Sequence, residues 1–307
     1  MAIKPMSCPG HIEVFKSRPR SYRELPLKLF EFGHVHRKEA SGALSGWLRL
    51  RGFVQDDSHV FASLEQLPAL IDQFVELVEQ AYPKFGFEEW SWKISLRPEQ
   101  RAGSEEGWDQ AERALREACQ ARGLLVEEKP GEGAFYGPKL EAVLKDRLGR
   151  SWQCGVVQVD FVLPDRFELE YQDAKGQWVR PVMLHHAVLG SLERWLAIVM
   201  EHHGGLPDAL HPQPVAVLPV SDRHSEKAKE WAKAIEQSIQ RPVVILDKGP
   251  LKGRLKEADG LMIPWRWVVG DQEQDIKGIG SVRRGHESVQ SMSLEEWVDL
   301  VAKEGLV

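Results

Sequence analysis

Cysteine and histidine lie close together near the start of the chain, in the stretch PMSCPGH at residues 5–11. Thiolate sulfur and imidazole nitrogen are common ligands of zinc in proteins. No second Cys/His pair with ligand spacing follows, so a metal site, a reactive thiol and a turn that buries one sulfur all stay open. The neighbours His185 and His186 would point to opposite faces of a sheet if their segment is extended. Spacing alone does not connect either of them, or His59, with Cys8.

Basic side chains flank a Gly/Ser-rich loop in the stretch HRKEASGALSGWLRLRGFVQDDSH, residues 36–59. Arg37 and Arg49 would converge on one anion if this segment forms two antiparallel strands. A guanidinium suits phosphate because its planar fork donates two parallel hydrogen bonds. The alternative is a solvated hairpin with surface arginines. A second glycine-rich stretch, GEGAFYGPK at 131–139, lacks the spacing of a phosphate-binding loop, so a simple turn between strands is its alternative.

The elements that must position these residues are mixed in the first two-thirds of the chain. Amphipathic periodicity predicts helices, and apolar/polar alternation predicts strands, two of them antiparallel and joined at Gly149. Such a mixture favours an antiparallel sheet flanked by helices, an α+β arrangement. The predicted elements are helices at 66–86 and 106–123, a strand at 88–98, two strands within 140–164, and a strand end running into a helix at 183–205.

A Gly/Pro-rich seam, GGLPDALHPQP at 204–214, separates this part from the rest of the chain. After it, buried-strand patterns alternate with helix patterns, which predicts a small α/β domain. We therefore expect two domains, at 1–208 and 209–307. The elements predicted in the second are strands at 215–220, 242–247 and 265–270 and helices at 225–239 and 293–305.

The composition excludes several classes of protein. A length of 307 residues suits two domains, and a net charge of −6 means that a nucleic-acid partner would need a local basic patch. Three scattered cysteines are too few for a disulfide framework and favour a reducing compartment. Apolar runs such as WLAIVM are far shorter than the ~20 residues of a membrane helix. We expect a soluble, cytoplasmic protein with no membrane partner.

Several stretches together resemble the threonyl-tRNA synthetases, which are class II enzymes. In the family's order they are IKPMSCPGH, RSYRELPLKLFEFGHVHRKEASGAL, RLRGFVQDDSHVF, GEGAFYGPKLE, QCGVVQVDF and RPVMLHHAVLGSLER. They cover most of residues 3–205, and residues 211–307 resemble the family's anticodon-binding domain more weakly. The resemblance implies a class II catalytic domain followed by this smaller α/β domain.

The resemblance also implies a zinc ion held by Cys8, His59 and His185, with His11 outside the ligand set. In this family the zinc takes the amino group and the side-chain hydroxyl of threonine. Valine has the same shape but no hydroxyl, so it cannot complete the coordination. An apolar pocket alone would separate two such isosteres poorly.

Three arginines gain roles from the same resemblance. Arg37, in class II motif 2, is expected to grip the α-phosphate of ATP, which binds with Mg²⁺, and Glu39 to face the nucleotide. Arg49 serves the ATP site from the returning strand, and Arg194 of motif 3 is expected at the adenine and γ-phosphate. Positions expected in the threonine and adenylate pocket or the motif 3 turn are Gln55, Asp57, Tyr136, Lys139, Gln153, Gln158 and Ser191.

The implied function is ATP-dependent activation of L-threonine to threonyl-adenylate and transfer to threonine tRNA. Two alternatives stay open: transfer of activated threonine to a non-tRNA acceptor, and a non-catalytic regulator that binds threonine or tRNA. They are motivated by departures from the family, such as the altered motif 2 loop at Ser45–Trp47. Residues 211–307 also carry 14 lysine and arginine against 15 acidic residues, net −1.

Two further departures affect the site and the assembly. His186 replaces the arginine usual beside the zinc histidine, and Val156 replaces a usual threonine. Motif 1 and the editing domain do not occur in the sequence. We therefore expect that serine is mischarged. Motif 1 is the family's main dimer element, so without it the sequence does not decide whether the chain forms a homodimer.

Overall fold

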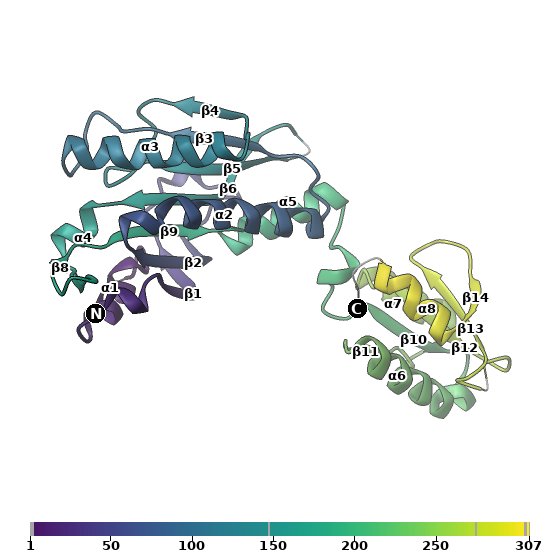
Figure 1. Ribbon diagram of the computed structural model, residues 1–307. Helices are drawn as coiled ribbons and strands as arrows, with labels where there is room; N and C mark the ends of the chain where they lie inside the picture. The colour runs from purple at the N-terminus through teal and green to yellow at the C-terminus, as the bar shows by residue number, and fades with distance from the viewer. Residues whose placement is uncertain (1–2, 147, 274, 304–305, 307) are drawn as a thin grey trace. The chain divides into compact units, whose positions relative to one another are not determined.

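The computed structural model describes residues 3–146, 148–273, 275–303 and 306, and the chain divides into two compact units, Met1–Gly204 and Gly205–Val307 (Figure 1). Each unit has its own sheet and its own covering helices. Among the described residues, no helix is both long enough and apolar enough to cross a bilayer.

One mixed sheet forms the centre of the first unit. In the part of this unit that the structure describes, seven strands follow the order β1-β2-β9-β6-β5-β3-β4. Neighbours are antiparallel except β3 and β4, which run parallel, so the predicted α+β class is confirmed. The strands are β1 (Leu27–His36), β2 (Gly52–Ala62), β3 (Ser91–Ser95), β4 (Val126–Lys129), β5 (Lys139–Lys145), β6 (Ser151–Asp160) and β9 (Val182–Ala187).

Helices cover both faces of this sheet. Apolar residues of α2 recur every three or four positions and are buried, and Phe74 contacts the rings of His186 in β9 and Trp92 in β3. The predicted helix at 66–86 ends earlier, because a 3₁₀ turn with Pro83 near its start begins at Tyr82, and Gly86 closes this turn with a left-handed backbone. The helices are α1 (Cys8–Lys16), α2 (Leu67–Ala81), α3 (Glu105–Ala121), α4 (Val162–Arg166) and α5 (Leu192–His203); a small hairpin joins β7 (Tyr171–Gln172) to β8 (Trp178–Val179).

The second unit has a parallel core and an antiparallel extension. β10 (Val215–Pro219) runs parallel to β11 (Val243–Ile245) and β12 (Trp265–Val269), as the strand–helix alternation predicts. The sequence did not indicate the antiparallel strands β13 (Ile279–Arg284) and β14 (Gln290–Ser293). The helices are α6 (Ser225–Ile239), α7 (Leu251–Gly260) and α8 (Leu294–Lys303), of which α7 was also not foreseen.

Gly280 in β13 allows the tryptophan core of the second unit to close. A Cβ at this position would lie 2.1 Å from the Trp267 ring and 3.2 Å from the Trp231 ring, and both rings are fully buried. We expect Gly280→Ala to destabilise the protein by about 1–3 kcal/mol through overpacking. Gly253→Ala in α7 is the control, because its Cβ would meet nothing closer than 3.7 Å and alanine favours a helix. Urea unfolding followed by circular dichroism tests this; equal midpoints for Gly280→Ala and the parent would contradict it.

Candidate active site

Helix α1 carries Cys8 onto one face of the first sheet. Its residues Cys8, Ile12 and Phe15 lie on one helix face and are buried. The Phe15 ring stacks on Phe61 of β2, with centroids 4.6 Å apart and planes 26° apart. Pro9 lies in the first turn, where its missing N–H leaves no hydrogen bond unmade. The stretch CPGH is therefore the start of a helix whose packing buries the thiol.

Strand register brings several predicted residues into one row. His59 in β2 lies directly opposite His185 in β9, which lies opposite Gln158 in β6 and, one strand further, Lys139 in β5. Directly opposite residues share a face of the sheet. His186 points to the other face and contacts Phe74 of α2, so the two neighbouring histidines diverge as the sequence predicts.

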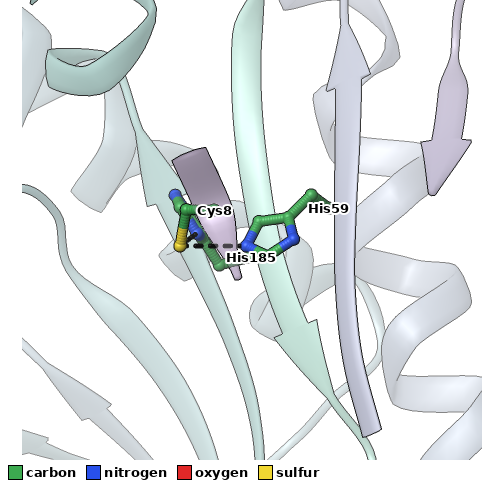
Figure 2. Close-up of side chains that lie close together, drawn as sticks. All are labelled: Cys8, His59 and His185. Atoms are coloured by element: carbon green, nitrogen blue, oxygen red, sulfur yellow. Dashed lines mark hydrogen bonds between the residues drawn. The ribbon is translucent and has the colours of Figure 1, made fainter. Parts of the chain in front are cut away.

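Cys8, His59 and His185 meet at this face, as Figure 2 shows. The Cys8 Sγ lies 3.1 Å from His59 Nε2 and 3.3 Å from His185 Nδ1, and the three potential ligand atoms lie within 4.8 Å of one another. All three side chains are buried. One thiol and two imidazoles suit zinc, and three protein ligands leave a coordination position open. The residues present therefore fit the implied metal.

The electrostatics of the cluster differ between its two histidines. Burial lowers the pKa of His59, and the neighbouring histidines lower it further. Burial also opposes charge on His185, but hydrogen bonds to Asp160 and Cys8 outweigh it and raise the pKa of that ring. Asp57 lies 3.7 Å from His59 Nε2, and burial raises the pKa of its carboxyl group.

The three predicted arginines line a cleft, which we call the arginine cleft. Arg37 lies with its guanidinium 5.2 Å from the Phe53 ring, and Arg194 lies 5.4 Å from the Trp152 ring. Arg49 pairs with Glu39 at 3.0 Å. Burial lowers the pKa of Arg194, and the charges of Arg49 and Arg37 lower it further. The arginine cleft is lined by Arg37, Glu39, Leu48, Arg49, Leu50, Phe53, Gln55, Gln153, Cys154, Val156, Gly190, Ser191 and Arg194.

The other predicted site residues lie beside the metal-type cluster. The Tyr136 ring is 5.3 Å from that of His185, Gln158 Nε2 donates to the Gly137 carbonyl, and Lys139 pairs with Glu141 at 2.6 Å. Strand β2 links the two regions. Its residues 55, 57 and 59 share one face, so this strand runs from the arginine cleft, which Gln55 lines, to the cluster, which contains His59.

Comparisons with known proteins agree with this arrangement. Residues 1–203 match the tRNA synthetase class II core domain (G, H, P, S and T), and residues 214–304 match an anticodon binding domain. The crystal structure of the RNA binding domain of threonyl-tRNA synthetase from Cryptosporidium parvum Iowa II is 36% identical, with a TM-score of 0.89, over 99% of this chain and 77% of that one. The chain belongs to the threonyl-tRNA synthetase family of class II synthetases.

Curated relatives lead to the same family. The chain is 48% identical to a threonine–tRNA ligase of Burkholderia multivorans and 46% identical to one of Ralstonia nicotianae, in each case over 97% of this chain and 47% of the relative. The chain thus spans about half the length of these curated relatives. The family that the sequence motifs predicted is confirmed.

The sequence patterns did not indicate two buried residues behind the arginine cleft, Asp56 and Tyr82. Asp56 accepts hydrogen bonds from the backbone N–H groups of Val188, Leu189 and Gly190, each at 2.8 Å. Burial raises the pKa of Asp56 to about 6, although these N–H groups act in the opposite direction. The Tyr82 hydroxyl donates to the Val188 carbonyl. In the stretch QDD, strand alternation would have sent Asp56 to the face opposite Asp57, which was the available signal.

Asp56→Asn is expected to loosen the turn that leads into α5. The two carboxylate oxygens together accept three N–H groups, and an amide has one oxygen, so its NH₂ must face at least one donor. We expect a loss of about 1–3 kcal/mol in stability, because at least one buried backbone donor loses its acceptor. Asp173→Asn is the control, since one oxygen of Asp173 accepts both of its backbone donors. Urea unfolding followed by circular dichroism tests this; an unchanged midpoint for Asp56→Asn would contradict it.

Proposed function

We propose that the chain activates L-threonine with ATP to form threonyl-adenylate and then transfers the threonyl group to threonine tRNA. The observation that carries this proposal is the gathering of Arg37, Arg49 and Arg194 around one cleft that β2 connects to the buried Cys/His/His cluster. The names of the threonine–tRNA ligase relatives support the choice of amino acid and acceptor.

In the first step the threonine carboxylate attacks the α-phosphorus of ATP. The bond between this phosphorus and the oxygen that bridges to the β-phosphate breaks, and pyrophosphate leaves with its Mg²⁺. Negative charge develops on phosphate oxygens, and Arg37, Arg49 and Arg194 stabilise it by charge-assisted hydrogen bonds. Arg194 lies in α5 and donates to the Leu48 and Gln153 carbonyls, so it needs little reorganisation as the charge develops.

Cys8, His59 and His185 would hold the family's zinc ion, which supplies an open coordination position for the amino group and the hydroxyl of threonine. Asp57 lies beside His59 and can accept a hydrogen bond from the threonine amino group. Tyr136 packs by its ring against His185 and closes this side of the pocket. These side chains orient the amino acid so that its carboxylate reaches toward the arginine cleft.

In the second step a hydroxyl at the 3′ end of the tRNA attacks the threonyl carbonyl carbon, and AMP leaves. The second unit belongs to a domain type that is described as anticodon binding, and we propose that it contacts the anticodon. Its near-neutral charge predicts modest affinity, since phosphate neutralisation dominates binding to nucleic acid. The three cysteines are buried and unpaired, which fits a reducing cytoplasm.

Threonine-dependent exchange of labelled pyrophosphate into ATP tests the first step. Exchange that requires both threonine and this chain is the expected result. Its absence at high protein concentration would overturn the proposal and favour a binding protein. Charging of purified threonine tRNA then tests the second step. Exchange without charging would favour a different acceptor for the activated amino acid.

Serine is expected to support exchange, whereas valine is not. Serine carries the same amine and hydroxyl and lacks one methyl group, which is worth only about 10–200-fold in a binding pocket. Valine leaves the polar groups of the site unpaired, and such sites reject the analogue by about 10⁴–10⁵-fold. Exchange kinetics with the three amino acids measure both ratios. Valine within tenfold of serine would contradict the role of the hydroxyl.

A further inference from the structure

Each histidine of the metal-type cluster has its outward ring nitrogen engaged by a second buried or half-buried group. His185 places Nε2 at 2.8 Å from Asp160 Oδ2, while its Nδ1 faces the Cys8 sulfur. His59 places Nδ1 at 2.7 Å from His11 Nδ1, while its Nε2 faces the same sulfur. The two rings therefore present different nitrogens to the cluster.

We propose that Asp160 and His11 are positioning residues that select the tautomers of His185 and His59. Each holds the ring proton on the outward nitrogen, so that an unprotonated nitrogen faces Cys8. A neutral imidazole binds a metal only through a nitrogen without a proton, and the hydrogen bond at the other nitrogen decides which one that is. The consequence for zinc affinity rests on the proposed function.

Asp160 is committed at both of its oxygens. Its Oδ1 accepts the backbone N–H groups of Val162 at 2.7 Å and Leu163 at 2.9 Å, which leaves Oδ2 for His185. The residue is fully buried. These bonds place Asp160 at the end of β6, where α4 begins, and fix the carboxylate relative to the His185 ring.

The bonds of Asp160 make its amide variant informative. In Asp160→Asn the amide oxygen stays with the two backbone donors, so the NH₂ group faces His185 Nε2. Two donors cannot share that contact, and the ring must move its proton to Nδ1. Nδ1 then points a proton at the cluster and no longer offers a lone pair to a metal.

His11 acts on His59 through a hydrogen bond between two imidazoles. Its Nε2 lies 3.9 Å from the Glu31 carboxylate, which favours a proton on that nitrogen. Nδ1 of His11 then accepts the proton of His59 Nδ1, and His59 Nε2 is left free for the cluster. Asparagine at position 11 offers an oxygen near the place of Nδ1, whereas phenylalanine keeps the ring and removes the acceptor.

Zinc affinity, measured by competition with a chromophoric chelator, tests the proposal on the full chain. Loss of such outer partners typically weakens metal binding about 10–100-fold. We expect Asp160→Asn near the upper end of this range, His11→Phe near the lower end, and His11→Asn within threefold of the parent. Asp173→Asn is the matched control. One oxygen of Asp173 accepts hydrogen bonds from two backbone N–H groups, as in Asp160, but Asp173 has no hydrogen bond to a histidine in these contacts. Affinities of Asp160→Asn and His11→Phe within threefold of the parent would overturn the proposal.

Ring-nitrogen NMR of the metal-free protein tests the tautomers without zinc, at a pH high enough for the His185 ring, whose pKa is raised, to be neutral. The expected spectrum has His185 protonated at Nε2 and His59 at Nδ1, with the His185 proton moved to Nδ1 in Asp160→Asn. The opposite tautomers in the parent chain would overturn the proposal. A parent chain that binds no zinc but shows the expected tautomers would refute the zinc part of the proposed function and leave the positioning roles standing.

Discussion

Replacement of His59 by alanine is expected to abolish the proposed zinc binding and to lower the proposed threonine-dependent exchange by more than about 100-fold. The loss exceeds that of an outer-shell partner because a ligand itself disappears. His59 is fully buried beside Cys8 and opposite His185, so its removal leaves only two of the three side chains of the cluster. Elemental analysis of dialysed protein and pyrophosphate exchange measure the two effects.

His34→Ala is the control for the His59 variant. His34 lies in β1 of the same sheet but is exposed and remote from the cluster. We expect this variant to keep both zinc and exchange activity. One zinc per chain in His59→Ala, together with exchange within threefold of the parent, would refute the ligand role.

Arg37→Ala is expected to lower the exchange rate by about 10²–10³-fold, which is the usual cost of removing one donor from developing charge. Arg37 has few competing partners: its Nε donates to the Pro5 carbonyl, and the guanidinium lies over the Phe53 ring at the wall of the arginine cleft. Arg37→Lys keeps the charge but loses the planar fork, so we expect an intermediate rate. Exchange kinetics at varied ATP concentration separate the effects on binding and on the chemical step.

Arg113→Ala is the matched control for Arg37→Ala, because Arg113 is an exposed arginine of α3 and does not line the arginine cleft. It tests whether loss of one positive charge anywhere on the chain affects exchange. A fall of less than threefold in Arg37→Ala, or an equal fall in Arg113→Ala, would count against a direct phosphate contact.

Local patterns predicted most of the elements that hold the site. The apolar period of α2 and the alternation in β6 are properties of neighbouring residues, so they can be read without a structure. The same logic failed for α7, because its apolar stripe is only Leu251, Leu255 and Ala258 and a charged residue, Arg254, is buried with it. It also failed for β13, where Gly280 interrupts the strand pattern because a tryptophan needs the space.

The sequence by itself determined the family and the sheet-and-helix class, and through the resemblance to that family it predicted the arginines and the cluster residues, since a resemblance depends on residue types in order along the chain. Only the tertiary structure decided which nitrogens of His59 and His185 face Cys8, and that Asp56, Asp160 and His11 hold the surrounding groups in place. The physical reason is that hydrogen bonds such as that of Asp160 to His185 join residues brought together by strand register. Their partners and directions exist only when the sheet has formed.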